Sequence, residues 1–225
     1  MAGTDIEIEY EKSGLLVVMS SRMNMNIEPF DSKYIPEIVR WVTPLWTMME
    51  WDADVSEKTS HKKQDLDVEF IVRHNIFSNE FALQLVCGEE LQAVAFAAEK
   101  DEENQALQWL ATESGKLSEK ERHSLQQVVD YLEEMDEKTC SFLEKGAVRL
   151  TLFASCQRGC GSVILLQLEE RLRRAGFKTM YLWTDSDCNH QWYPNHGFTL
   201  VEAQRNETFS TPEKNFMTYI FKKQL

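Results

Sequence analysis

The sequence has no run of apolar residues long enough to cross a membrane, which takes about 20 in a row. Near the N-terminus, the apolar run at residues 15–19 is too short for the core of a secretory signal, and the residues before it are acidic. We therefore expect a cytoplasmic protein with no membrane partner.

Basic charge is also scarce. The chain has 24 Lys and Arg residues against 37 Asp and Glu, which gives a formal net charge of −13. Proteins that bind nucleic acid or anionic membranes nonspecifically rely on a basic surface. The balance therefore predicts no nucleic-acid partner, and it is compatible with a cationic substrate such as an amine.

Cysteine is too sparse and too irregular for a disulfide framework. The five cysteines are odd in number and unevenly spaced, which is typical of reduced thiols. Cys188, His190 and His196 are residue types that bind zinc, but their spacing matches no tetrahedral site and a fourth ligand is missing. We expect no metal.

The most informative stretch that is present is Cys-Gln-Arg-Gly-Cys-Gly-Ser at residues 156–162. A β-branched, alternating segment at 147–153 precedes it, and apolar residues at helical spacing follow it as far as Gly176. The pattern predicts a strand, a glycine turn and a helix. Glycine permits a tight bend, and the free N–H groups and dipole at a helix start favour an anion. We therefore expect a phosphate site, with Arg158 adding positive charge.

The remaining elements follow from periodicity. Strand patterns lie at 23–30, 81–87, 91–98, 147–153, 179–184, 197–201 and 215–221. Helical patterns begin near Asp31 and Ser56, and a short helix is predicted at 191–196. We expect a single domain over residues 23–225, preceded by an N-terminal arm, 1–22, of uncertain structure.

Residues 100–145 differ from the rest because they are charged, poor in β-branched residues and helical in pattern. Ser118 and Glu121 form a capping-box pattern, followed by an apolar stripe at helical spacing. The segment is predicted to be a helical insertion between two strands. It is either a lid over the site or a contact in a homodimer.

A dinucleotide site is one alternative for the glycine turn. Gly159 and Gly161 match the first two glycines of G-x-G-x-x-G, and an acid such as Asp185 lies at a plausible distance. Ile164 is too bulky for the third glycine position, and the chain has too few repeated strand–helix–strand units. An enzyme that binds a dinucleotide or S-adenosylmethionine is the third option for function.

A second stretch, residues 188–198, contains Tyr193 four residues before a Gly-Phe pair. A phenol at this place is a candidate general acid that gives its proton to a leaving thiolate. The alternative is a packed tyrosine whose hydroxyl bonds to backbone. Cys160 has two interpretations as well: a reactive thiol at a helix start, or a small residue that fills the turn.

The order strand, glycine loop, helix ending in Gly-Phe, strand, Asn-x-x-x-Tyr and Gly-Phe resembles the GNAT superfamily of acetyl-CoA-dependent N-acetyltransferases. The likeness covers residues 23–225 in element order and 147–201 in detail. It implies an α+β fold with a mixed, mostly antiparallel central sheet, splayed at the CoA site and flanked by helices. The sequence departs from the family at Cys156, which occupies the position where the family usually has Gln or Arg, and at residues 100–145, which replace a connection that is usually short.

The resemblance also implies roles for particular residues. Tyr193 would be the general acid, and Asn189 would contact the CoA arm. Acetyl-CoA would be the cosubstrate. The residues expected to bind it are Phe153, Ala154, Gln157, Arg158, Gly159, Cys160, Gly161, Ser162 and Asn189.

The implied reaction is direct attack by an amine of a small molecule or peptide on the acetyl thioester in a ternary complex. Glu99, at a predicted strand end, is a conceivable base. The alternative function is a catalytically idle CoA-binding or protein-interaction module of the same fold, which Cys156 and the acidic insertion suggest.

Overall fold

The computed structural model describes residues 7–10, 16–20, 23–45, 57–77 and 80–225. The strands form one nine-stranded sheet in the order β1-β2-β3-β4-β5-β6-β7-β9-β8, and every neighbouring pair is antiparallel except β6–β7. Their bounds are β1 (Glu7–Tyr10), β2 (Leu16–Ser20), β3 (Met23–Pro29), β4 (Ala82–Cys87), β5 (Glu90–Ala98), β6 (Ala147–Ser155), β7 (Thr179–Asp185), β8 (Thr199–Arg205) and β9 (Met217–Gln224).

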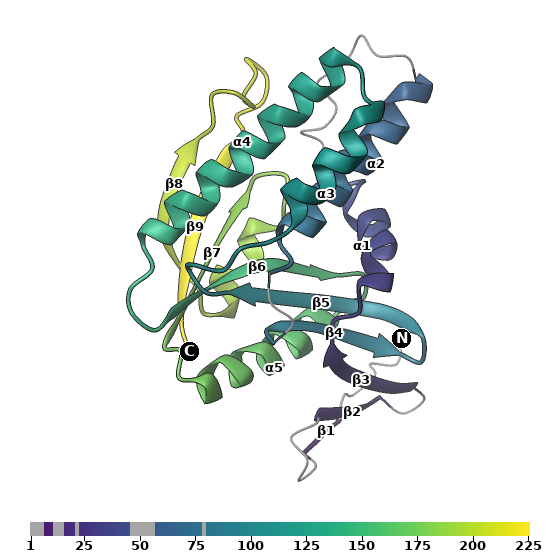
Figure 1. Ribbon diagram of the computed structural model, residues 1–225. Helices are drawn as coiled ribbons and strands as arrows, with labels where there is room; N and C mark the ends of the chain where they lie inside the picture. The colour runs from purple at the N-terminus through teal and green to yellow at the C-terminus, as the bar shows by residue number, and fades with distance from the viewer. Residues whose placement is uncertain (1–6, 11–15, 21–22, 46–56, 78–79) are drawn as a thin grey trace.

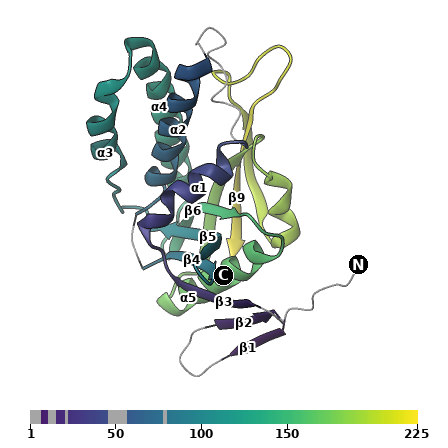
Figure 2. The ribbon, with the colours of Figure 1, turned by 90° about the vertical axis from the view of Figure 1, so that its right-hand side faces the viewer.

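Helices cover both faces of the sheet (Figures 1 and 2). One face carries α1 (Ile35–Val42), α2 (Glu57–His74), α3 (Ala106–Glu113) and α4 (Glu119–Ser141), and the other carries α5 (Cys160–Ala175). In the described part of the chain, no helix has the length and apolar character needed to span a bilayer.

Alternation along β5 separates the two hydrophobic layers. Val94 and Phe96 pack with the helices α1, α2 and α4, whereas Ala93, Ala95 and Ala97 belong to the layer that contains α5. Successive strand residues point to opposite faces, so the small alanine side chains lie where α5 crosses the strand and allow close approach. This packing fixes the start of α5 against the centre of the sheet.

The insertion contains α3 and α4, and its predicted capping box is confirmed. The Ser118 hydroxyl oxygen accepts the Glu121 N–H at 3.3 Å, and the Glu121 carboxylate accepts the Ser118 N–H at 2.7 Å. The stripe from Leu125 to Met135 is buried inside the chain, against α2 and β7 (Figure 1). The apolar face of the insertion is therefore used within the protomer.

Several predicted boundaries are corrected. The predicted helix at 191–196 is two 3-10 turns, His190–Trp192 and Pro194–His196, because Pro194 starts a new turn and Gly197 ends it in the left-handed region at φ 85°. The N-terminal arm contains the strands β1 and β2, which extend the sheet beyond β3. The predicted helix cap at Ser56 lies outside the described residues.

Candidate functional site

The sheet splits between β6 and β7. These parallel strands pair only over residues 147–149 and 179–181. Beyond that point β6 stays paired with β5 as far as Ser155, and β7 stays paired with β9 as far as Asp185, so the two strands diverge (Figure 1). The facing edges of residues 150–155 and 182–185 have no ladder partner, which leaves a gap lined by backbone donors and acceptors.

A cleft of about 90 Å³ occupies this split. Some of its lining residues belong to the α5 layer, namely Leu150, Phe153, Leu182 and Tyr193. Others belong to the layer of α2 and α4, namely Ile71, Leu132, Leu152, Trp183 and Cys188. The cleft therefore has residues of both layers in its wall, and we call its two ends the α5 mouth and the α4 mouth.

The glycine loop lies at the α5 mouth and needs both of its glycines. Gly159 has φ 92°, a conformation that L side chains rarely adopt. A Cβ on Gly161 would lie 3.0 Å from the Phe153 ring and 3.4 Å from Ser155 Cβ. The N–H groups of Gly161 and Ser162 donate to no group among the described residues. They point out of the first turn of α5, where the helix dipole favours an anion.

The side chains of the loop contribute less than its backbone. Gln157 and Arg158 are exposed. Cys160 is buried in the α5 layer, burial raises the pKa of its thiol, and its N–H is already bonded to the Gln157 carbonyl at 3.3 Å. The residue therefore fills the turn, as the second interpretation of Cys160 predicted.

Cys156 fixes the loop to β5. Its N–H donates to the Gln92 carbonyl at 3.1 Å, and its thiol contacts the carbonyls of Leu91 and Gln92 at 3.6 and 3.5 Å. Burial raises the pKa of this thiol. The position that holds a polar anchor in the GNAT pattern serves here to tie the loop to the sheet.

Tyr193 lines the cleft at the α5 mouth. Its ring meets Phe198 edge-on at 5.4 Å and Phe221 at 5.6 Å. Within the described part of the chain its hydroxyl has no hydrogen bond to backbone or side chain. Burial, with the nearby Cys188 and Asp185, raises the pKa of the phenol. The phenol is therefore protonated at neutral pH.

Asp185 lines the same cleft and was not predicted as a catalytic group. It is the last residue of β7 and is 3% exposed. One carboxylate oxygen accepts the N–H groups of Asp187 and Cys188 at 3.0 and 3.2 Å. Burial outweighs these bonds and raises the pKa to about 6, and the charge of Asp187 acts in the same direction. The signal available in the sequence was an acid at the end of a buried strand.

Asp185 and Tyr193 belong to opposite mouths. Trp183, two residues before Asp185, packs in the layer of α2 and α4, and side chains two apart on a strand share a face. Tyr193 packs in the α5 layer. The cleft thus has a carboxylate with a pKa near neutrality on one side and a neutral phenol on the other.

Of the predicted site residues, Phe153 and Tyr193 line the cleft, and the loop residues 157–162 do not. Asn189 is exposed, and Ala154 is half-buried beside the split without lining the cleft. Glu99 is exposed beyond the end of β5, so its suggested role as base has no support from its position. Across the ranges that the structure describes, no three His, Cys, Asp or Glu residues come together as a metal site.

No protein-family model and no curated protein matches the chain. Solved structures do match its fold. Arylalkylamine N-acetyltransferase 2 from Aedes aegypti matches with a TM-score of 0.52 at 11% identity, over 89% of this chain and 98% of that one. An agmatine N-acetyltransferase in its apo form matches with a TM-score of 0.50 at 11% identity, over 89% and 99% of the two chains. The protein therefore has the GNAT acetyltransferase fold, as its sequence predicted.

Proposed function

We propose that the protein is an acetyl-CoA-dependent N-acetyltransferase acting on an amine of a small molecule or peptide. The observation that carries this proposal is the cleft through the split sheet, with a glycine loop at one mouth and Tyr193 in its wall. The fold shared with N-acetyltransferases supports it.

The residues present fit acetyl-CoA as cosubstrate. The free N–H groups of Gly161 and Ser162, with the α5 dipole and the exposed Arg158, suit a pyrophosphate. The unpaired edge of β6 suits the amide-containing pantetheine arm, which can add to a strand edge as a peptide does. Acetyl-CoA would supply the activated thioester.

The two titratable groups suit the two proton transfers. The amine nitrogen forms a bond to the acetyl carbon, and the bond from that carbon to the CoA sulfur breaks. Asp185 accepts the proton that the nitrogen sheds, because its carboxylate is mostly ionised at neutral pH. Tyr193 donates its proton to the departing sulfur from the cofactor side.

The test is transfer itself. The purified chain is incubated with acetyl-CoA and a panel of primary amines, and the products are identified by mass spectrometry. A thermal-shift comparison of acetyl-CoA, NAD and S-adenosylmethionine is run in parallel, because a ligand that binds only the native state raises its stability. We expect stabilisation by acetyl-CoA and acetylation of at least one amine. CoA binding without transfer to any amine would favour the idle module, and stabilisation by NAD alone would overturn the proposal.

A further inference from the structure

We propose that the insertion, residues 100–145, builds the acceptor mouth of the cleft, with Leu132 as its wall and Asp136 as a positioning residue that holds Trp183. The acceptor it fits is a primary amine carried on an apolar group. This inference rests on the proposed function, since it names the substrate class for the same site.

The two mouths cannot serve the same ligand. The glycine loop and the start of α5 lie on one face of the sheet, so a phosphate-bearing cosubstrate enters there. The opposite mouth is lined by Ile71 on α2, by Asn75 directly after α2, and by Leu132 on α4. This second mouth is therefore the one left for the acceptor.

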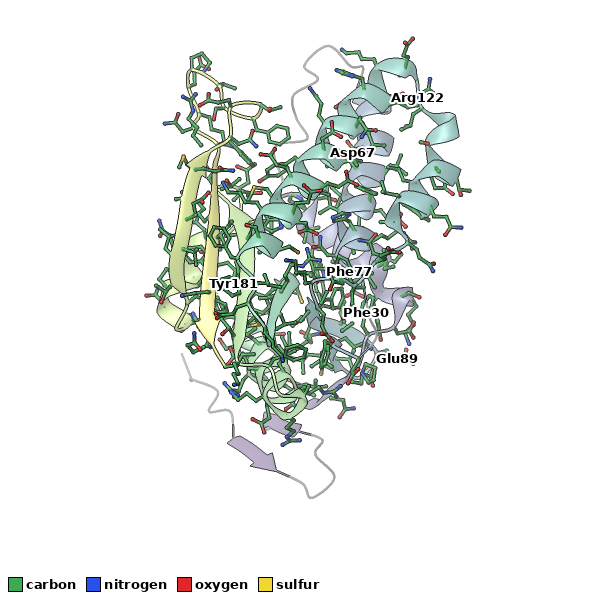
Figure 3. The ribbon with its side chains drawn as sticks, turned by 60° about the vertical axis from the view of Figure 1, so that its left-hand side comes forward. Phe30, Asp67, Phe77, Glu89, Arg122 and Tyr181 are labelled. Carbon is green, nitrogen blue, oxygen red and sulfur yellow. The ribbon has the colours of Figure 1, made fainter. Side chains whose placement is uncertain are left out.

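Leu132 is the direct contribution of the insertion. It is 1% exposed and belongs to the apolar stripe of α4, yet it also lines the cleft. Figure 3 shows Arg122 near the end of α4 that lies away from the sheet. A helix that only shielded the core would have no side chain in the cleft.

Asp136 lies one helical turn after Leu132 and joins the three elements that meet at the split. One carboxylate oxygen accepts the indole N–H of Trp183 on β7 at 2.8 Å. The other lies 2.7 Å from Arg149 Nη1 on β6 and 3.3 Å from His74 Nε2 on α2. Arg149 is the last β6 residue paired with β7, at the vertex of the split. His74 precedes Asn75 in the cleft wall.

The charge on Asp136 is maintained in a buried setting. Burial opposes ionisation, but the hydrogen bond from His74 and the charge of Arg149 hold the pKa below its usual value. The guanidinium of Arg149 also lies 5.0 Å from the Phe77 ring. A buried ion pair contributes little net stability compared with apolar packing, so its use here indicates a positional role.

The chemistry of this mouth is apolar with one acidic end. Ile71, Leu132 and the indole of Trp183 form its walls. Two donors in the wall are already used: the Asn75 side-chain amide N–H donates to the Ile71 carbonyl at 2.7 Å, and the Thr151 hydroxyl donates to the Asn75 backbone carbonyl at 2.8 Å.

Asp185 supplies the acidic end. Burial raises the pKa of the Tyr131 phenol on α4, and the charge of the nearby Asp185 raises it further. The Tyr131 hydroxyl is buried and has no hydrogen-bond partner among the described residues. One carboxylate among apolar walls suits one ammonium group and leaves no counter-charge for a second.

The test uses amine binding to the CoA-saturated protein, measured by calorimetry, so it does not depend on turnover. The probes are propylamine, hexylamine and 1,6-diaminohexane. We expect hexylamine to bind at least about tenfold more tightly than the diamine, because the second ammonium would enter an apolar wall. Leu132→Ala should change the ratio of hexylamine to propylamine affinity by about tenfold, since a few methylene contacts are worth 1–3 kcal/mol. CoA affinity should stay the same.

Leu125→Ala is the matched control, because Leu125 is buried on the same stripe of α4 but does not line the cleft. It should lower the melting temperature as Leu132→Ala does and leave the amine ratio unchanged. Trp183→Phe, which removes the N–H that Asp136 holds, should raise the KM for the acceptor more than it lowers kcat.

Three outcomes would overturn the inference: no binding of any amine to the CoA complex, equal ratios for the Leu132 and Leu125 variants, or a matching loss of CoA affinity. Failure of the proposed function would look different, as amine binding without transfer or as absence of CoA binding.

Discussion

The two mouths of the cleft are built by different means. At the α5 mouth the proposed ligand groups are the backbone N–H groups of Gly161 and Ser162, which are adjacent in sequence. At the α4 mouth the walls are side chains from distant elements, and the bond from Trp183 to Asp136 spans 47 residues. In the proposed function the first mouth binds an anion through main-chain groups, whereas the second depends on the packing of side chains. Substitutions at the two mouths should therefore separate cosubstrate binding from acceptor choice.

The largest effect is expected from Gly161→Val at the backbone mouth. The added Cβ meets Phe153 at 3.0 Å, and the branched side chain covers the N–H groups. Two hydrogen bonds to a charged group are worth about 1.5–3 kcal/mol each, so CoA affinity should fall at least about 100-fold. Calorimetric titration with CoA measures it. Gly115→Ala, where an added Cβ meets nothing within 4 Å, is the control. Unchanged CoA affinity in the Val variant would remove the loop from the site.

Tyr193→Phe tests the proposed general acid at the α5 mouth. The hydroxyl makes no hydrogen bond in the described structure, so its removal should leave stability and CoA affinity nearly unchanged. Turnover should fall by about 100-fold, a typical contribution of a general acid. Steady-state kinetics with the best amine give kcat. Because phenylalanine keeps the aromatic ring, the packing of the side chain is unchanged and only the hydroxyl is tested. Equal turnover across the pH range would show that another group protonates the sulfur.

Asp185→Asn tests the acidic end of the acceptor mouth. The wild-type kcat/KM should rise with pH through about 6, where the carboxylate ionises, and the Asn variant should lose that rise. The loss at neutral pH should be about tenfold, and it should shrink as the pH approaches the pKa of the amine, when a free amine needs no base. A pH profile that keeps the same inflection in the Asn variant would assign it to another group.

The same carboxyl predicts that stability falls as the pH rises, whereas kcat/KM rises with pH. A pKa raised to about 6 means that the folded state binds more protons than the unfolded state between about pH 4 and 6, so stability falls as pH rises through this window. Asp185→Asn removes the charge and keeps an oxygen for the two N–H groups. It should be more stable than wild type at pH 7 by at most about 3 kcal/mol, with no gain below about pH 4. Urea unfolding at pH 4 and 7 measures the difference.

The difference between the mouths also explains what sequence could predict. The glycine loop and the capping box at Ser118 are local, because their partners lie within a few residues, and both were predicted correctly. The prediction of one short helix after β7 was wrong, because a proline inside that stretch starts a second turn. The role of Asp185 depends on burial, and the position of Asp136 depends on contacts with β6, β7 and α2. The periodicity of residue types along the sequence does not indicate which residues from distant elements come into contact.

The smallest effect is expected at Cys156. Substitution there tests whether the loop binds CoA through its main chain or through the side chain at this position. If the loop binds CoA through main chain, the residue in the place of the usual Gln or Arg matters only for loop position. Its N–H bond to Gln92 survives any substitution except proline, and the thiol contacts at 3.5 and 3.6 Å are weak. Cys156→Ser should therefore change CoA affinity by less than about threefold, under 0.7 kcal/mol.

Cys156→Arg is the informative partner: an exposed guanidinium beside the loop should tighten CoA binding in low salt and lose the gain at high salt, because screening weakens exposed charge pairs. A large loss in the Ser variant would mean that this side chain, and not the backbone alone, holds the cosubstrate.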